Sequence, residues 1–201
     1  MILKSERIAD LLENPDKKDP LVIVPCPNLL DLRKSGSASI DLRLGTWFVT
    51  PRQARMSHLN IIEGETTQAQ FTKINYVPFG SQYYLHPRSF VLGVTLEWLR
   101  LPIDLAGYIV GKSSWGRCGL IIATAAGVHP GFKGCLTLEL SNTGEVPIPI
   151  IPGMTICQLF LHRVEKSTDD VDQSGFVGQR QPILGKIKLD KVASKLAQAH
   201  K

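Results

Sequence analysis

Residues 135–141 read Cys-Leu-Thr-Leu-Glu-Leu-Ser, and this alternation of apolar and polar side chains favours a β-strand with one buried face. The strand has a leucine face of Leu136, Leu138 and Leu140 and a polar face of Thr137, Glu139 and Ser141. A polar face either meets solvent or borders a pocket, where a carboxylate held near a water acts as a general base. Periodicity alone leaves both interpretations of Glu139 open.

Outward from this strand, the chain between Pro20 and Val164 consists of short apolar or alternating runs broken by Gly and Pro. Such a pattern predicts an all-β sandwich or barrel, and the lack of β-α-β alternation argues against a doubly wound fold. We expect a surface loop or hairpin insertion over Met56–Thr72. The predicted strands include Ile40–Leu44, Trp47–Val49, Tyr83–Leu85, Phe90–Thr95, Gly107–Val110, Leu136–Leu140, Val146–Ile151 and Cys157–Val164.

The two ends of the chain differ from this β-rich centre. Helical spacing of apolar residues predicts a short helix over Ser5–Asn14, with Ser5 as its possible cap. Residues 166–175 form a polar linker, and residues 176–201 form an arm that ends in a predicted helix over Leu189–His200. We therefore expect one domain over residues 1–165 and a linker, lid and basic tail over residues 166–201.

Composition narrows the classes of protein. A chain of 201 residues with 43% hydrophobic residues can bury one core without disulfides or structural metal. The formal net charge of +5 would suit a nucleic-acid binder, but residues 186–201 hold five lysines against one aspartate, as a solvated basic tail would. A small polyanionic substrate fits the remaining charge equally well. With no membrane-length apolar run and no secretory signal pattern, we expect a cytoplasmic protein.

The cysteines and histidines are dispersed. Cys26, Cys118, Cys135 and Cys157 include no C-x-x-C pair, which suggests buried thiols in a reducing compartment. The sequence has no H-x-E and no P-C-x-x-C, so it lacks the zinc-water machinery of common cytidine deaminases. We therefore expect no protein-bound metal, and any deamination would proceed without zinc.

Chemistry-bearing residues gather most densely in residues 111–119, Gly-Lys-Ser-Ser-Trp-Gly-Arg-Cys-Gly. Glycines let the main chain approach a ligand, and Lys112 and Arg117 would neutralise an anion there. The order is not that of a Walker A loop. The same composition is also typical of an ordinary surface turn.

Two further segments fit a ligand pocket as well as they fit ordinary turns. His129 lies in a Gly- and Pro-rich hairpin just before the alternating strand. Residues 176–182, Phe-Val-Gly-Gln-Arg-Gln-Pro, could close over an anionic ligand as a lid that excludes water.

Six segments, in order along the chain from about Ser5 to Pro182, resemble the motifs of the dCTP deaminase and dUTPase superfamily. Any one of them would be weak support, whereas six in order are strong. The segments are Ala38–Gly45 (ASIDLRLG), Phe90–Pro102, Lys112–Arg117 (KSSWGR), Pro130–Asn142 (PGFKGCLTLELSN), Pro152–Gln158 (PGMTICQ) and Phe176–Arg180 (FVGQR).

The resemblance implies a distorted jelly-roll or β-clip barrel of the dUTPase type, assembled as a homotrimer with active sites between subunits. It implies a hydrolase that acts on a cyclic amidine C–N bond and converts dCTP to dUTP and ammonia. Glu139 would activate the water, Ser113 and the main chain near Ala125 would hold it, and Arg117 would stabilise charge. Magnesium would arrive on the triphosphate, and no membrane or nucleic-acid partner is implied.

The positions that the resemblance assigns to the nucleotide extend over most of the quoted motifs. They are Lys112, Ser113, Ser114, Trp115, Gly116, Arg117, Ala125, His129, Thr137, Leu138, Glu139, Gln158 and Gln179.

Three departures from the family pattern concern substrate contacts. His129 replaces the usual Asp, Phe176 replaces the lid Tyr, and Trp115 replaces the usual Leu. Two alternatives to dCTP deamination follow. One is cleavage of dUTP or dCTP to the monophosphate and pyrophosphate on the same fold, and the other is a nucleotide-binding regulator that has lost turnover.

Overall fold

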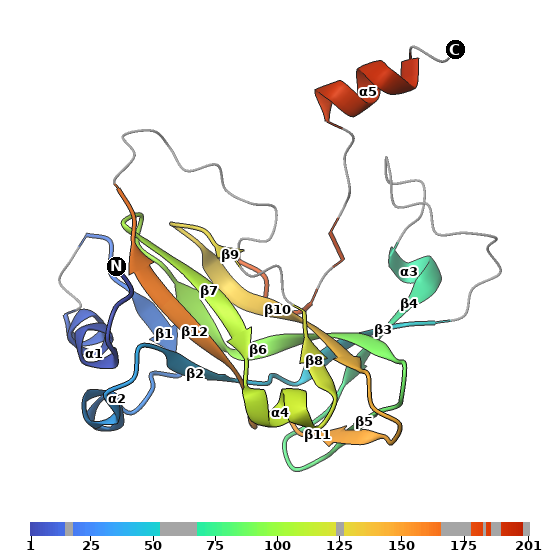
Figure 1. The fold of residues 1–201 in the computed structure, drawn as a ribbon, viewed down its shortest axis with the longest axis horizontal. Coiled ribbons are helices and arrows are strands. Elements are labelled where there is room, and N and C mark those ends of the chain that lie inside the picture. Colours follow the sequence, from blue (N-terminus) through green and yellow to red (C-terminus); the bar gives the residue numbers. More distant parts are fainter. Residues whose placement is uncertain are drawn as a thin grey trace.

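The computed structural model describes residues 1–14, 18–52, 68–123, 127–165, 178–182, 184–185 and 190–198. Its centre is a β-barrel of jelly-roll type formed by two sheets (Figure 1), which confirms the predicted fold class. The six-stranded sheet runs β4 (Thr72–Tyr76), β3 (Trp47–Pro51), β6 (Phe90–Arg100), β10 (Lys133–Asn142), β8 (Leu120–Ile122), with β1 (Val22–Val24) paired to β6. The four-stranded sheet runs β2 (Ile40–Arg43), β12 (Thr155–Arg163), β7 (Leu105–Gly111), β9 (Gly127–Val128), and β11 (Ile148–Ile150) pairs with β5 (Tyr83–Leu85).

Strand β10 has the two faces that its alternation predicts. Leu138 and Leu140 are fully buried in the core, while Thr137 and Glu139 on the opposite face are half-buried. The strand pairs antiparallel with β6, where Glu139 lies opposite Leu92. Both sheets contribute to one continuous hydrophobic core, which is the arrangement expected when each sheet has one apolar face.

A buried carboxylate connects the two sheets. Glu97 of β6 is 2% exposed and accepts hydrogen bonds from the Arg43 main-chain N–H (2.8 Å) and Nε–H (2.9 Å). Thr95 stays close to this pair, because its hydroxyl donates to the Glu97 main-chain oxygen and accepts from the Leu136 N–H, both at 2.9 Å. A buried charge is tolerated only when it is paired in this way. The network therefore links β2 of one sheet to β6 and β10 of the other.

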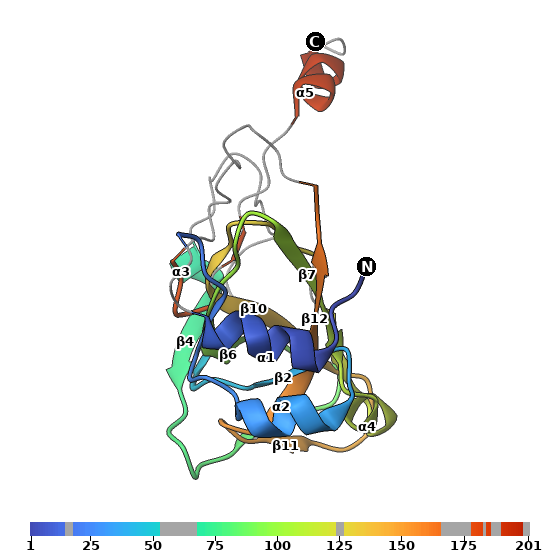
Figure 2. The same ribbon diagram turned by 90° about the vertical axis from the view of Figure 1, so that its left-hand side faces the viewer.

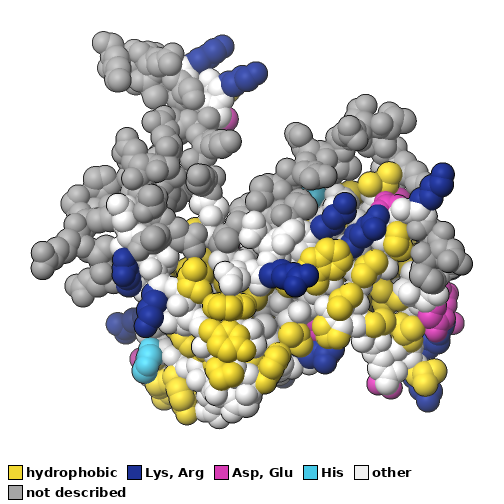
Figure 3. All heavy atoms as spheres, turned by 180° about the vertical axis from the view of Figure 1, so that it is seen from behind, with side chains coloured by type: hydrophobic (Ala, Val, Ile, Leu, Met, Phe, Trp, Pro, Cys, Tyr) yellow, Lys and Arg dark blue, Asp and Glu magenta, His cyan; other side chains and the backbone are white. Residues whose placement is uncertain are grey.

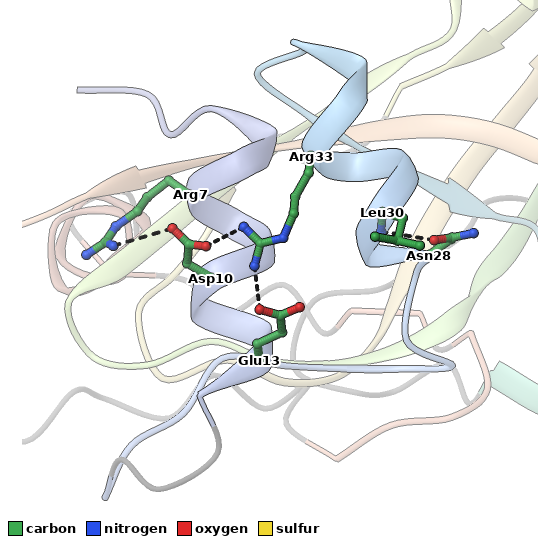
Figure 4. Close-up of polar contacts among 6 residues, drawn as sticks. All are labelled: Arg7, Asp10, Glu13, Asn28, Leu30 and Arg33. Carbon is green, nitrogen blue, oxygen red and sulfur yellow. Dashed lines mark hydrogen bonds and ion pairs between the residues drawn. The ribbon is translucent and has the colours of Figure 1, made fainter.

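Two short helices, α1 (Ser5–Glu13) and α2 (Leu29–Ser35), lie side by side against the barrel (Figure 2). Arg33 of α2 forms ion pairs with Asp10, at 2.6 Å, and with Glu13 of α1 (Figure 4). Hydrogen bonding to Arg33 lowers the pKa of Asp10 below its usual value. Because the folded pKa is depressed, this stabilisation is present above the unfolded pKa of an aspartate and is lost at more acidic pH.

The predicted role of Ser5 as a helix cap is wrong. Lys4 occupies the N-cap position without a side-chain cap, and Ser5 is the first residue of α1. The Ser5 hydroxyl is buried and accepts a hydrogen bond from the Ser35 hydroxyl at 2.9 Å. The Ser5 hydroxyl therefore serves the contact between α1 and α2 and does not cap the N-terminus of α1.

Several elements are not predicted from the sequence, because most are too short to show a period and the burial of β4 does not alternate. They are α2, α3 (Gln68–Phe71), α4 (Ser113–Arg117) and strands β1, β4, β8 and β9. Most of the expected insertion, residues 53–67, lies outside the described residues, and Thr72 already belongs to β4. The terminal helix α5 (Lys191–Gln198) falls within the stretch predicted for it. No helix in the described parts of the chain has the length and apolar character needed to span a membrane.

Replacing Asn142 with Ala should destabilise the fold by about 3 kcal/mol, because it leaves buried main-chain groups without partners. The fully buried Asn142 amide donates to the carbonyls of Leu85 and Val146, both at 2.8 Å, and accepts from the Gly144 N–H at 2.9 Å. Chemical denaturation of both proteins would measure the difference in the free energy of unfolding. Asn75→Ala, at a less buried amide that donates to the Thr50 hydroxyl, is the control and should cost under about 1 kcal/mol. Equal losses would contradict the special role of Asn142.

Candidate active site

The segment that the sequence marks as richest in chemistry folds as the short helix α4, between β7 and β8. The indole N–H of Trp115 donates to the Thr155 carbonyl at 2.9 Å, and the half-buried ring packs against the core. The Lys112 N–H donates to the Ile156 carbonyl at 3.2 Å. These contacts fix α4 on β12. The side chains of Ser113, Ser114 and Arg117, together with Gly116, are exposed.

Lys112 and Gln158, both predicted to bind nucleotide, meet at one carboxylate. The Lys112 Nζ lies 2.7 Å from Asp41 Oδ2, and Gln158 Nε2 donates to Asp41 Oδ1 at 3.2 Å. Asp41 and Gln158 are register partners on neighbouring strands β2 and β12, which places them on the same face of the four-stranded sheet. Asp41 lies in the motif Ala38–Gly45, but the sequence alone assigns it no role. Its signal was a polar residue between the apolar Ile40 and Leu42.

Glu139 is half-buried on the outward face of β10. Its main-chain oxygen accepts from the Ala123 N–H at 2.9 Å. Among the residues that the structure describes, none forms a hydrogen bond or ion pair with its carboxylate. A carboxylate free to accept a proton is what a general base requires.

Glu139 and α4 of the same chain lie at different positions along β10. The turn after α4 is held at the far end of this strand, where Gly119 accepts from the Thr143 N–H at 2.9 Å. Thr143 is four residues beyond Glu139, which corresponds to about 13 Å along an extended strand. The predicted catalytic groups Ser113 and Arg117 are therefore not placed beside Glu139 by the local pairing of one chain.

Apolar side chains are exposed on this face of the six-stranded sheet. Ser141 of β10 lies opposite Phe90 on one side and Ile121 on the other, so the three side chains form one cross-strand row. Phe90 and Ile121 are each 42% exposed. The view of the molecule from behind shows hydrophobic side chains, in yellow, gathered at the surface of the part of the chain that the structure describes (Figure 3). Exposed apolar groups in a row mark a surface suited to association.

The remaining predicted positions have different surroundings. Leu138 is fully buried in the core, so only its main chain is available to a ligand, whereas Thr137 is half-buried on the same face as Glu139. His129 is exposed, and its carbonyl accepts from Phe132 in the turn before β10. Gln179 pairs through its main chain with Cys135 at 2.8 Å. Ala125 and Phe176 lie outside the described residues.

The expectation of buried thiols is only partly right. Cys157 is fully buried, and burial raises the pKa of its thiol to about 12. Burial also raises the pKa of the half-buried Cys135, although the charge of Arg180 acts in the opposite direction. Cys26 and Cys118 are exposed, because Cys26 lies in the irregular segment after β1 and Cys118 in the turn after α4, rather than inside a strand.

Comparison with known proteins identifies the relatives of this chain. Residues 2–164 match the family model described as dCTP deaminase-like. A protein named "dCTP deaminase, dUMP-forming" from Corynebacterium kroppenstedtii is 41% identical over 155 residues, covering 74% of this chain and 81% of that protein. A protein of the same name from Mycobacterium sp. (strain KMS) is 42% identical over 144 residues, covering 71% and 74%. The crystal structure of 2'-deoxycytidine 5'-triphosphate deaminase from Agrobacterium tumefaciens has the same fold, with a TM-score of 0.57 and 22% identity over 82% of this chain and 48% of that one.

Replacing Trp115 with Phe should lower the free energy of unfolding by about 1 kcal/mol, because the Thr155 carbonyl loses its hydrogen bond while most of the ring contact remains. Thermal unfolding followed by circular dichroism would measure the change. Trp47→Phe is the matched control, since the described residues provide no hydrogen-bond acceptor for the Trp47 indole. If both substitutions lowered the Tm equally, the indole bond would not be what holds α4.

Proposed function

Because the chain belongs to the dCTP deaminase-like family, we propose that it deaminates dCTP, with Glu139 as the general base that activates the attacking water. The observation that carries this proposal is the half-buried Glu139 on the outward face of β10, where no described residue neutralises its carboxylate. A structural carboxylate in this protein has a different environment. Glu97 is fully buried and pairs with Arg43.

The proposed chemistry needs one water at the base. Glu139 takes a proton from that water as it attacks C4 of the cytosine ring, and the resulting tetrahedral carbon expels the amino group. The proton held by Glu139 passes to the leaving nitrogen, which departs as ammonia. The remaining proton of the C4 hydroxyl moves to N3, and the ring becomes uracil. One carboxylate can both accept the water proton and return it to the leaving group.

We further propose that the final nucleotide is dUMP. The sequence alone led us to expect dUTP, whereas the relatives from Corynebacterium and Mycobacterium are named dUMP-forming. The additional step uses a second water, which cleaves the bond between the α- and β-phosphates and releases pyrophosphate. In balance, dCTP and two waters give dUMP, ammonia and pyrophosphate. The alternative reading of the sequence, triphosphate cleavage on the same fold, then becomes part of one reaction sequence.

Helix α4 is our candidate for the triphosphate contact. Arg117 supplies positive charge, Lys112 supplies an ammonium group that is paired with Asp41, and Ser113 and Ser114 supply exposed hydroxyls, in a segment that Trp115 holds on the barrel. Magnesium would accompany the triphosphate oxygens rather than occupy a site built only from protein groups. Gln158 can reach the same nucleotide, because it shares Asp41 with Lys112.

We propose a homotrimer in which Glu139 of one subunit faces α4 of a neighbour. Two observations support an assembled site. A distance of about 13 Å along β10 separates Glu139 from the end of the strand that holds the turn after α4 of the same chain. The exposed Phe90 and Ile121 lie next to Glu139 on the same face, and a neighbouring subunit would cover them.

Incubation with dCTP and magnesium, with ammonia and pyrophosphate measured separately, tests this function. We expect both products in equal amounts, with dUMP as the nucleotide. Ammonia without pyrophosphate would restore dUTP as the product. Pyrophosphate without ammonia would make the protein a pyrophosphohydrolase. Binding of dCTP by calorimetry with neither product would identify a regulator and overturn the proposal.

Replacing Glu139 with Gln should leave dCTP binding intact and reduce ammonia release by at least about 100-fold, the scale of lost general-base catalysis. Calorimetry measures the binding and the ammonia assay measures turnover. Glu145→Gln, at an exposed glutamate in the turn after β10, is the matched control and should keep full activity. Unchanged turnover in the Glu139 variant would remove this residue from the mechanism.

A further inference from the structure

The C-terminal arm returns to the barrel and runs along the edge of β10. The Gly178 N–H donates to the Lys133 carbonyl at 2.6 Å, and the Cys135 N–H donates to the Gln179 carbonyl at 2.8 Å. Pro182, three residues further on, is buried. This edge is the one opposite β6, and β8 occupies its other half at Leu140–Asn142. The arm therefore acts as a short additional strand, and main-chain hydrogen bonds supply its attachment.

Gly134 is the residue that allows the arm to lie so close. Its φ of 141° lies in a region that L side chains rarely adopt. A Cβ built on Gly134 would lie 3.1 Å from the Gln179 carbonyl oxygen and 3.2 Å from its nitrogen, both main-chain atoms. Contacts this short are tighter than nearly all those of real Cβ atoms, so the arm backbone would have to give by a few tenths of an ångström, in addition to the strain of the positive φ at Gly134.

We propose that Gly134 is a positioning residue that docks the arm on β10 of its own chain and so sets Gln179 and Arg180 beside the strand that carries Glu139. The inference rests on the proposed function for its effect on the nucleotide. The docking itself rests only on the two hydrogen bonds and the missing side chain. The sequence does not indicate this role, since the glycine lies against main-chain atoms of Gln179, 45 residues away in sequence.

The docked arm adds charge to the face that bears the candidate base. Cys135, Thr137 and Glu139 share one face of β10, and Glu139 lies four positions after Cys135. Arg180 directly follows Gln179, whose carbonyl accepts from the Cys135 N–H, so the docked arm carries a positive charge to the edge of β10. A cation there attracts an anionic nucleotide without taking part in proton transfer. Loss of docking should therefore raise KM for dCTP more than it lowers kcat.

The principal test is Gly134→Ala compared with Gly80→Ala. Gly80 also has a positive φ, of 83°, and a Cβ built on it meets nothing within 4 Å, so its alanine variant tests positive-φ strain without contact with another chain segment. For Gly134→Ala we expect faster hydrogen exchange at the Cys135 amide, faster tryptic cleavage after Arg180, and a KM about tenfold higher, the effect of losing one or two hydrogen bonds. Gly80→Ala should match the wild type in all three.

A second variant tests the same contact in case the Gly134→Ala protein does not fold. Gly178→Pro removes the donor to the Lys133 carbonyl and cannot adopt the φ of 82°, yet leaves β10 unchanged. It should reproduce the same exchange, cleavage and KM changes. The double variant Gly134→Ala with Gly178→Pro should be no worse than either single variant, because both break one contact.

The outcomes separate this inference from the proposed function. Unchanged exchange at Cys135 and unchanged cleavage after Arg180 in both variants would overturn the docking role, whatever the enzyme does to dCTP. The same changes in Gly80→Ala would also overturn it, because backbone strain alone would then be the cause. Release of the arm in a protein that produces no ammonia would leave the docking role standing and reject only the deaminase proposal.

Discussion

The antiparallel pairing of β10 with β6 is the constraint on which the rest of the structure depends. A register shift of one residue would turn the leucine face outward and bury Thr137 and Glu139, so the hydrophobic core fixes the register. Burial of Leu138 and Leu140 thereby determines where the candidate base points. The other edge of the same strand then receives β8 and the arm, which brings three parts of the chain to one surface.

The spacing of apolar residues in the sequence predicted those parts of the fold in which buried and exposed positions alternate regularly over several residues. Strand β10, the helix at Ser5 and the strand around Cys157 all show such a period, and the structure contains them. Strands of two or three residues, such as β8 and β9, are too short to display one. They form because a neighbouring strand offers unpaired main-chain groups, and this information is not local in sequence.

The residues of the candidate site also fall into those that the sequence identifies and those that it does not. Motif residues such as Lys112, Arg117 and Glu139 could be identified from their chemistry and order along the chain. Asp41 could not be assigned, because its role depends on the pairing of β2 with β12 across more than a hundred residues. Leu138 is a motif position of another kind, since its side chain belongs to the core and only its main chain is available to a ligand.

The contrast between the four thiols makes the protein selectively reactive towards cysteine-directed probes. Alkylating reagents attack the thiolate, and the buried Cys157 keeps its proton far above neutral pH. A fluorophore added under mild conditions would attach at the exposed Cys26 and Cys118. Since Cys118 directly follows Arg117, substitution of both Cys26 and the half-buried Cys135 would leave one exposed thiol as an optical reporter at the end of α4.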